Sequence, residues 1–269
     1  MAIAASPLGP PGPVPGDSYV QSFARGLEVI RSFSASSPRQ TLSEVAARSG
    51  LSRAGARRIL LTLQTLGYVE GDGKHFSLTP RILDLGFAYL SSLPIWNLAE
   101  PVMEALAGEV GESCSAAVLD GTDIVYVLRV STHKIMSITL GVGSRLPAYC
   151  TSMGRVLLAA LPDDQAMACL KASKPESLTR HTVTELDALR QKIAQTRKQG
   201  WCLVNQELEE GLVSMAAPIH DRAGRTVAAL NISGQANRTS ARVMQDNMLQ
   251  PLLQAAQTIS RLLAVQNKG

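Results

Sequence analysis

Residues 41–67 decide the fold of the N-terminal part of the chain, and they read TLSEVAARSGLSRAGARRILLTLQTLG. Thr41 and Glu44 have the spacing of a capping box, which predicts a helix that begins here and ends at Gly50. Ser52 can cap a second and longer helix. Because only a short turn with a glycine separates the two helices, the stretch predicts a helix-turn-helix.

Motifs on either side extend this unit. Residues 68–78 read YVEGDGKHFSL, in which two strand-like pieces flank a glycine-rich turn, so a β-hairpin, or wing, is expected. Apolar residues at helical spacing predict another helix before the motif and an amphipathic connecting helix after it. The interpretation is a winged helix-turn-helix domain over residues 19–80 and a linker helix over residues 81–94.

A second domain is expected over residues 95–266, where helical and strand-like patterns mix. Helices are predicted over residues 98–109, 151–161, 185–199 and 240–265. Strands are predicted over residues 113–119, 124–130, 136–140, 201–205, 213–219 and 227–233. Tight turns join several of these strands, which favours an α+β fold with an antiparallel sheet.

Length and composition agree with this division. The 269 residues suffice for two domains, and 45% hydrophobic with 18% charged residues describes a globular chain. No charge-free apolar run reaches the ~18 residues of a membrane span. Residues 1–18 contain five prolines and lack the pattern of a signal peptide, so we expect a disordered tail. The four cysteines have no CxxC spacing, which favours buried free thiols and a cytoplasmic protein.

The excess positive charge lies in the N-terminal domain. Residues 19–81 contain nine basic and four acidic side chains, whereas the rest of the chain, with 17 basic and 18 acidic, is close to neutral. A basic module joined to a near-neutral one suggests that the first binds a polyanion and that the second has another task.

Candidate DNA-contacting residues lie on the second helix of the motif and on the wing. The side of this second helix that packs into the core is predicted to consist of Ile59, Leu60, Leu63 and Leu66. Arg53 and Arg57 are one turn apart and can reach guanine in the major groove, while Arg58 and Lys74 suit phosphates or the minor groove. The complete set of DNA-binding candidates is Ser52, Arg53, Arg57, Arg58, Thr62 and Lys74. The alternative is a solvated basic face.

Candidate ligand-binding residues lie in the second domain. Residues 150–155 read CTSMGR and precede a helix, so free N–H groups near Ser152 and Met153 can bind a carboxylate. Strand residues that can share one face supply further contacts: Leu212, Ser214, Asn231 and Ser233. Arg129 and Arg145 are candidates to clamp an acid. Ordinary hydrogen bonds of a sheet and surface salt bridges are the alternatives.

No enzyme, metal site or cofactor is expected. Ser152 has no G-x-S-x-G elbow around it, and the histidines and cysteines lack metal-ligand spacing. The chain has neither a P-loop nor a dinucleotide-binding glycine motif.

With these motifs in view, residues 19–265 resemble the IclR family of bacterial transcription regulators. The resemblance is carried by LSEVA at residues 42–46, GLS at 50–52, TSMGRVLLA at 151–159, GW at 200–201, ELEEGL at 207–212, AAPI at 216–219 and AALNISG at 228–234. Residues 19–27 and 84–90 are similar to the branch that controls aromatic-acid catabolism through the β-ketoadipate pathway.

This resemblance implies a winged-helix head, a GAF-like α/β effector domain and a homodimer formed through the heads, often assembled as a dimer of dimers. It also implies a double-stranded DNA operator and a small carboxylate effector such as protocatechuate, 4-hydroxybenzoate, muconate or β-ketoadipate. By position, the family's pocket maps onto Ser152, Met153, Leu212, Ser214, Asn231 and Ser233.

One position departs from part of the family. Val204 stands where glyoxylate-sensing relatives have an acidic residue, and an apolar side chain there favours a larger or ring-bearing acid. A regulator of another pathway that senses a short acid, such as glyoxylate or pyruvate, is the alternative. The resemblance leaves open whether the protein activates or represses.

Overall fold

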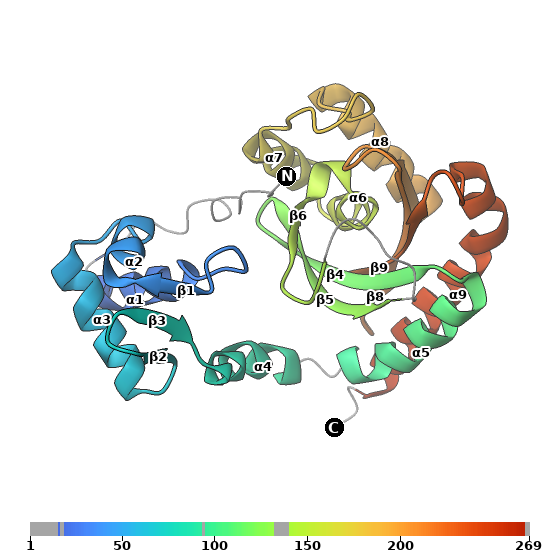
Figure 1. The fold of residues 1–269 in the computed structure, drawn as a ribbon. Coiled ribbons are helices and arrows are strands. Elements are labelled where there is room, and N and C mark those ends of the chain that lie inside the picture. The colour runs from blue at the N-terminus through green and yellow to red at the C-terminus, as the bar shows by residue number, and fades with distance from the viewer. Residues whose placement is uncertain (1–15, 17–18, 93–94, 132–139, 267–269) are drawn as a thin grey trace. The chain divides into compact units, whose positions relative to one another are not determined.

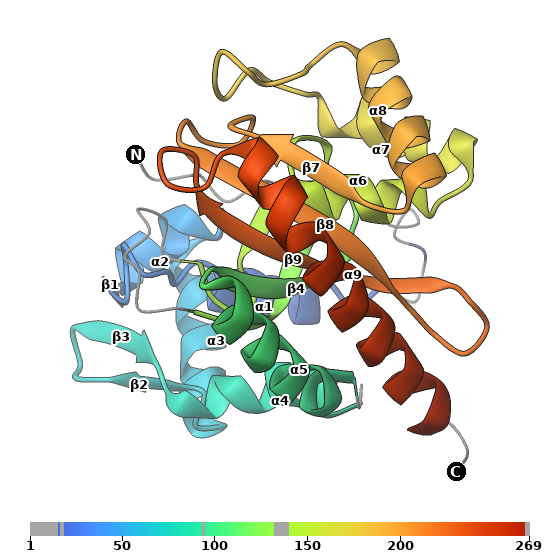
Figure 2. The ribbon, with the colours of Figure 1, turned by 90° about the vertical axis from the view of Figure 1, so that its right-hand side faces the viewer.

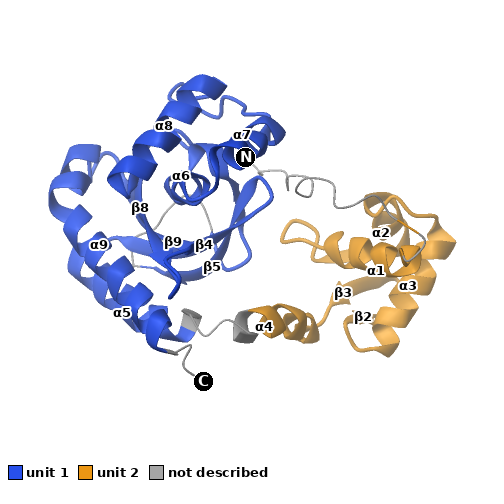
Figure 3. Ribbon diagram, turned by 180° about the vertical axis from the view of Figure 1, so that it is seen from behind, with its two compact units in different colours: residues 1–11, 93–269 blue, residues 12–92 orange. Residues whose placement is uncertain are grey.

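The computed structural model describes residues 16, 19–92, 95–131 and 140–266, and the chain divides into two compact units (Figures 1 and 3). The first unit holds the described residues up to Ser92, and the second holds those from Ile95 onward. Most of the expected tail and of the expected strand over residues 136–140 lies outside the described residues. Among the described helices, none is long and apolar enough to cross a membrane.

The first unit contains three helices packed against a small sheet, followed by a connecting helix. Its elements are α1 (Gln21–Arg31), β1 (Arg39–Thr41), α2 (Leu42–Arg48), α3 (Arg53–Thr65), β2 (Val69–Gly71), β3 (His75–Leu78), the 3-10 turn η1 (Pro80–Ile82) and α4 (Leu83–Ser92). The strands pair antiparallel in the order β1-β3-β2, so β1 joins the predicted wing as a third strand that the sequence patterns did not indicate.

The capping signals explain where these helices begin and end. The Oγ1 atom of Thr41 accepts a hydrogen bond from the Glu44 amide at 3.4 Å, and the Glu44 carboxylate accepts one from the Thr41 amide at 2.7 Å. Gly50 has a φ of +65°, which lets the chain leave α2. Ser52 then accepts from the Gly55 amide at 3.1 Å and starts α3. The predicted helix-turn-helix is therefore present.

The core of this unit forms where the three helices meet. Its fully buried side chains include Val29, Val45, Ala56 and Leu60. Leu66, expected on the buried stripe, is 51% exposed because α3 ends at Thr65 and the chain turns away there.

The second unit is a curved sheet with helices on both faces. Its elements are α5 (Ile95–Val110), β4 (Ser113–Asp120), β5 (Asp123–Val130), β6 (Arg145–Pro147), the 3-10 turn η2 (Ala148–Cys150), α6 (Ser152–Ala159), α7 (Asp163–Ser173), α8 (Leu186–Gln199), β7 (Cys202–Asn205), β8 (Leu212–His220), β9 (Thr226–Gln235) and α9 (Ala241–Gln266). The strand order is β6-β5-β4-β9-β8-β7, and all neighbours are antiparallel. The predicted α+β class is confirmed.

Different helices pack against the two faces of this sheet. Helices α5 and α9 lie on one face, while α6 lies against the other, with α7 and α8 outside it (Figures 1 and 2). Apolar side chains from α6 and the sheet form the core on the second face, among them Met153, Leu158 and Val204. This core surrounds the beginning of α6, which places that helix terminus inside the domain.

Candidate functional site

The DNA-binding candidates of the first unit are all on its surface. These exposed residues are Ser52, Arg53, Arg57, Arg58, Thr62 and Lys74. Among the described residues, none forms an ion pair with Arg53, Arg57, Arg58 or Lys74, so these cations are available to an anionic partner. The hydroxyl of Thr62 donates to the Arg58 carbonyl at 2.9 Å, inside α3.

The turn of the wing is held by Asp72. Its carboxylate accepts hydrogen bonds from the amides of His75, at 2.7 Å, and Lys74, at 3.0 Å, and it also pairs with Arg39 of β1. The two amide hydrogen bonds, with the Arg39 charge, hold the pKa of Asp72 well below its usual range. This fixed turn carries Lys74 at the tip of the wing, where a phosphate contact would position the protein on DNA.

A cavity lies in the second unit at the beginning of α6. Its free interior volume is small, about 20 Å³. Strands β5, β7, β8 and β9, the start of α6 and the loops around it supply its lining residues: Tyr126, Leu140, Cys150, Thr151, Ser152, Met153, Val204, Leu208, Leu212, Ser214, Asn231 and Ser233. Seven predicted effector residues are thus brought together here: Ser152, Met153, Val204, Leu212, Ser214, Asn231 and Ser233. Their contact with an effector stays a prediction.

The beginning of α6 supplies hydrogen-bond donors to this cavity. Thr151 caps the helix by accepting from the Gly154 amide at 3.2 Å. A Cβ atom at position 154 would lie 2.2 Å from the Ala148 carbonyl oxygen, so only glycine permits this close approach. The amides of Ser152 and Met153 occupy the first two helical positions and donate to no described residue. Such a helix terminus favours a carboxylate.

Side chains add neutral polar groups to the same cavity. The Ser152 hydroxyl is buried without a hydrogen-bond partner among the described residues. Burial raises the pKa of Tyr126 to about 12, so its phenol is protonated at neutral pH and can donate. Among the described lining residues none carries a charge, so the cavity offers dipoles and hydroxyls rather than an ion pair.

The two predicted arginines lie elsewhere. Arg129 faces Ser115 across the β4–β5 pair, beside the cavity rather than in its lining, and its Nε donates to the Ser131 hydroxyl at 3.1 Å. Arg145 is bound by Asp120 at 2.6 Å and by Asp123 at 3.3 Å. Arg145 therefore takes the salt-bridge alternative in this structure, and its role toward an effector stays a prediction.

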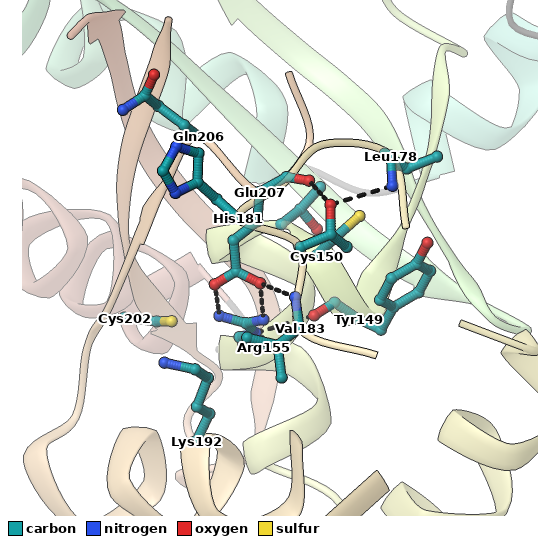
Figure 4. A network of polar contacts seen from close by, with 12 residues as sticks. Tyr149, Cys150, Arg155, Leu178, His181, Val183, Lys192, Cys202, Gln206 and Glu207 are labelled. Carbon is teal, nitrogen blue, oxygen red and sulfur yellow. Dashed lines mark hydrogen bonds and ion pairs between the residues drawn. The ribbon is translucent and has the colours of Figure 1, made fainter. Parts of the chain in front are cut away.

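A buried ion pair joins α6 to the segment that precedes the lining residue Leu208 (Figure 4). Arg155 of α6 donates from Nη1 and Nη2 to the two carboxylate oxygens of Glu207, at 2.6 and 2.5 Å, and from Nε to the Tyr149 carbonyl at 2.9 Å. Glu207 also accepts from the Val183 amide at 3.1 Å. Both charged side chains are nearly inaccessible, so their partners replace water.

Sequence reasoning missed five lining residues. These are Tyr126, Leu140, Cys150, Thr151 and Leu208. Cys150 and Thr151 precede the predicted Ser152 directly, so the CTSMGR motif already contained them. Strand alternation from Ile124 would have placed Tyr126 on the inner face, but nothing in the sequence indicated which strand residues meet α6.

A winged helix-turn-helix joined to an α+β domain with an internal cavity defines a DNA-binding transcriptional regulator. Two family profiles match the chain: the IclR helix-turn-helix domain over residues 22–73, and the bacterial transcriptional regulator IclR C-terminal domain over residues 87–261. The chain belongs to the IclR family of bacterial transcriptional regulators.

Curated relatives support one branch of this family. The chain is 40% identical over 263 residues to the Pca regulon regulatory protein of Pseudomonas putida, covering 97% of this chain and 90% of the relative. It is 31% identical over 252 residues to the p-hydroxybenzoate hydroxylase transcriptional activator of Acinetobacter baylyi, covering 92% and 93%. These relatives confirm the resemblance to the aromatic-catabolism branch.

Solved structures agree over most of the chain. A protein from Rhodococcus sp. RHA1 is 50% identical with a TM-score of 0.84, covering 93% of this chain and all of that one. An IclR homolog from Microbacterium hydrocarbonoxydans, complexed with 4-hydroxybenzoate, is 26% identical with a TM-score of 0.78, covering 90% and 99%.

Proposed function

We propose that this protein is a homodimeric regulator of aromatic-acid catabolism genes that binds a small carboxylate of the aromatic-acid pathway in the α6 cavity. The observation that carries the proposal is the pair of free amides, at Ser152 and Met153, that begin a helix at the cavity. 4-Hydroxybenzoate and protocatechuate are the first candidate effectors, and muconate and β-ketoadipate are the second. No cofactor is needed.

The chemistry of the cavity supports an acid with an apolar body. The helix start suits the carboxylate, while Val204, Leu208 and Leu212 supply apolar wall. Val204 is 3% exposed and apolar, so it can pack against the body of a ligand. A two-carbon acid has almost no apolar surface to bury against it and gains little binding free energy there. The relative from M. hydrocarbonoxydans, complexed with 4-hydroxybenzoate, agrees with a ring acid.

Exposed apolar side chains of the first unit support a dimer formed through the heads. Phe23 and Leu27 of α1 are 68% and 43% exposed, and Leu83 and Phe87 of α4 are 69% and 67% exposed. A second copy would cover such surfaces, and its two-fold axis would match a palindromic operator. A dimer of dimers is a further stage of the same assembly.

The bound effector would change how the two heads reach DNA. In this mechanism Arg53 and Arg57 read bases in the major groove, and Ser52, Arg58, Thr62 and Lys74 hold the backbone. The connecting helix α4 transmits the change, and the acid must bind the two arrangements with different affinity. Such a regulator acts in the cytoplasm, where the bacterial DNA is.

Thermal unfolding of the full chain with a panel of acids tests this function. The panel contains protocatechuate, 4-hydroxybenzoate, cis,cis-muconate, β-ketoadipate, glyoxylate and pyruvate. An acid at ~100 times its Kd stabilises the folded domain by about 2.7 kcal/mol, which raises the melting temperature measurably. Stabilisation by any of the first four acids supports the proposal. A response to glyoxylate or pyruvate alone would contradict it and favour a short-acid sensor.

A further inference from the structure

Helix α3, which carries most of the DNA-binding candidates, ends at Gly67. This glycine has a φ of +79°, and the following amide, of Tyr68, donates to the Leu63 carbonyl at 2.9 Å and closes the last turn. A Cβ atom at position 67 would lie 3.1 Å from Nη1 of Arg81, so this guanidinium packs directly against the Gly67 backbone. A positive charge at the C-terminal end of a helix is favourable. Arg81 therefore stabilises the end of α3 from outside the helix.

Further contacts join the same end of α3 to the residues that precede the connecting helix α4. The Thr79 hydroxyl donates to the Gly67 carbonyl at 2.5 Å, and the Thr79 amide donates to the Tyr68 carbonyl at 3.0 Å. The guanidinium carbon of Arg81 lies 5.7 Å from the centroid of the Tyr68 ring, within the range of a cation–π contact. Gly67, Tyr68, Thr79 and Arg81 together form what we call the α3–α4 junction.

The α3–α4 junction lies directly before α4. Thr79 is the N-cap of η1, which α4 follows without a break from Leu83. The Ile82 amide donates to the Thr79 carbonyl at 3.2 Å, so η1 is closed on the same threonine. Every residue from 83 to 89 is exposed. Because so little of α4 is buried, the contacts at its beginning set its direction relative to α3.

The path of the chain alone would connect the two helices less directly. From α3 the chain runs through β2, the turn at Asp72 and β3 before it reaches Thr79, and β3 is also paired with β1. A displacement of α4 that travelled along this path would first bend the wing. The α3–α4 junction offers a shorter route, because Thr79 and Arg81 contact the residues that end α3 itself.

We propose that Thr79 and Arg81 lock the beginning of α4 to the C-terminal end of α3, so that a displacement of α4 reorients α3 and its arginines as one rigid piece. This inference rests on the proposed function, in which α4 transmits the effect of a bound acid. It names the residues through which the effect reaches α3. They are positioning residues, since neither has to touch DNA or the acid. Coupling needs a structural element whose two arrangements both sites bias, and the joined α3 and α4 supply it.

Thr79→Val/Arg81→Ala in the full chain tests this role. It removes the hydroxyl and the cation but keeps the backbone hydrogen bond of residue 79. Fluorescence anisotropy measures the affinity for a duplex selected from a random pool by the wild type, with and without protocatechuate, 4-hydroxybenzoate, cis,cis-muconate or β-ketoadipate. The ratio of the affinities with and without acid is the coupling factor. The variant should bring this factor closer to one by about 2–30-fold, the range for substitutions along a coupling route. Its affinity for the acid, by calorimetric titration, and for DNA without acid should stay those of the wild type.

Matched variants separate this role from general effects. Thr65→Val/Arg31→Ala removes another hydroxyl-to-carbonyl bond, from Thr65 to Leu61 at 2.9 Å, and another exposed arginine, at the end of α1. It should keep the wild-type coupling factor. Tyr68→Phe keeps a ring for the Arg81 cation and should keep the factor as well. Arg81→Ala alone leaves both Thr79 hydrogen bonds in place and should change the factor in the same direction as the double variant.

The outcomes distinguish this inference from the proposed function. A wild-type coupling factor in Thr79→Val/Arg81→Ala would overturn the inference and leave the effector function standing. A loss of DNA affinity that is equal with and without acid would also overturn it, because Arg81 would then be a phosphate contact. A wild type whose DNA affinity none of the four acids changes would overturn the proposed function and this inference together.

Discussion

A buried ion pair between Arg155 and Glu207 connects two segments that line the α6 cavity. Arg155 follows the lining residues Ser152 and Met153 on α6, and Glu207 precedes the lining residue Leu208. Their two-pronged ion pair spans 52 positions of sequence. The separation of the two segments is thus set by charged groups with fixed geometry rather than by apolar packing alone.

Arg155→Met should destabilise the second unit by about 3–5 kcal/mol, because it leaves the Glu207 carboxylate buried without its partner. Urea denaturation followed by tryptophan fluorescence measures this change. Arg190→Met is the matched control, since it breaks a pair with Asp163 in which Arg190 is 57% exposed, and it should cost no more than ~1 kcal/mol. If the two variants lost the same free energy of unfolding, a structural role for the buried ion pair would be contradicted. Adding Glu207→Leu to Arg155→Met should restore part of the loss.

Gly154→Ala should destabilise the protein by about 1–3 kcal/mol, because the new methyl group would collide with the Ala148 carbonyl beside the cavity. Gly108→Ala, in α5, meets no atom within 4 Å and should instead stabilise by about 0.5–1 kcal/mol. Thermal denaturation compares the two. The Gly154 variant should also bind acids more weakly, since it shifts the start of α6. If Gly154→Ala left the free energy of unfolding unchanged, the turn before α6 would be able to accommodate a methyl group at this position.

Arg57→Ala and Lys74→Ala should weaken DNA binding in different ways. Loss of the Arg57 base contact should reduce the binding free energy by about 1–3 kcal/mol and relax specificity at one position of the DNA site. Loss of the Lys74 phosphate contact should reduce the affinity for all DNA sequences by a similar factor. The measurement is equilibrium binding to a duplex selected from a random pool by the wild type, at several salt concentrations. Lys74→Ala should lower the salt slope by about one.

Arg222→Ala is the control for these two variants. Arg222 is exposed and basic but lies in the second unit, on the β8–β9 turn. Its removal should change neither affinity nor specificity. If it weakened binding as much as Arg57→Ala, total charge rather than α3 would account for DNA binding.

The wing should lose stability in acid. The pKa of Asp72 is lowered by the amides of His75 and Lys74, so its stabilising effect is complete above the ordinary aspartate pKa of about 3.9 and is lost as pH falls through the lower folded value. In hydrogen-exchange mass spectrometry, Asp72→Asn should exchange faster than the wild type over the wing at pH 7. The difference should shrink below pH ~4. A pH-independent difference would mean that the charge of Asp72 is not what holds the turn.

Local signals account for what could be predicted from the sequence. The Thr41 capping box, Ser52 and the positive-φ glycines are each satisfied within a few residues, so the helix-turn-helix was readable. The three-residue strands β1 and β6 were missed because so short a strand has no alternation to detect. Helix α7 was also missed, and its charged and polar surface leaves only Ala166 and Leu170 buried.

Long-range relationships explain the rest of the candidate site. No local sequence pattern marks Glu207 or Ser115. The folded chain brings Glu207 to Arg155, 52 positions away, and it brings Ser115 to Asn231, 116 positions away. Arg145 was singled out as an acid clamp because arginine can bind a carboxylate at two points. In the folded sheet it forms ion pairs with Asp120 and Asp123, two carboxylates of the protein itself, which the sequence alone did not indicate.

The central claim is that an acid bound in the second unit controls how the heads bind DNA. Fluorescence anisotropy of the selected duplex, titrated with the wild-type chain with and without saturating 4-hydroxybenzoate or protocatechuate, tests it most directly. The account predicts that at least one acid changes the affinity by about 5–150-fold, the usual range of coupling between two sites. Superimposable binding curves with an acid that demonstrably occupies the cavity would contradict it.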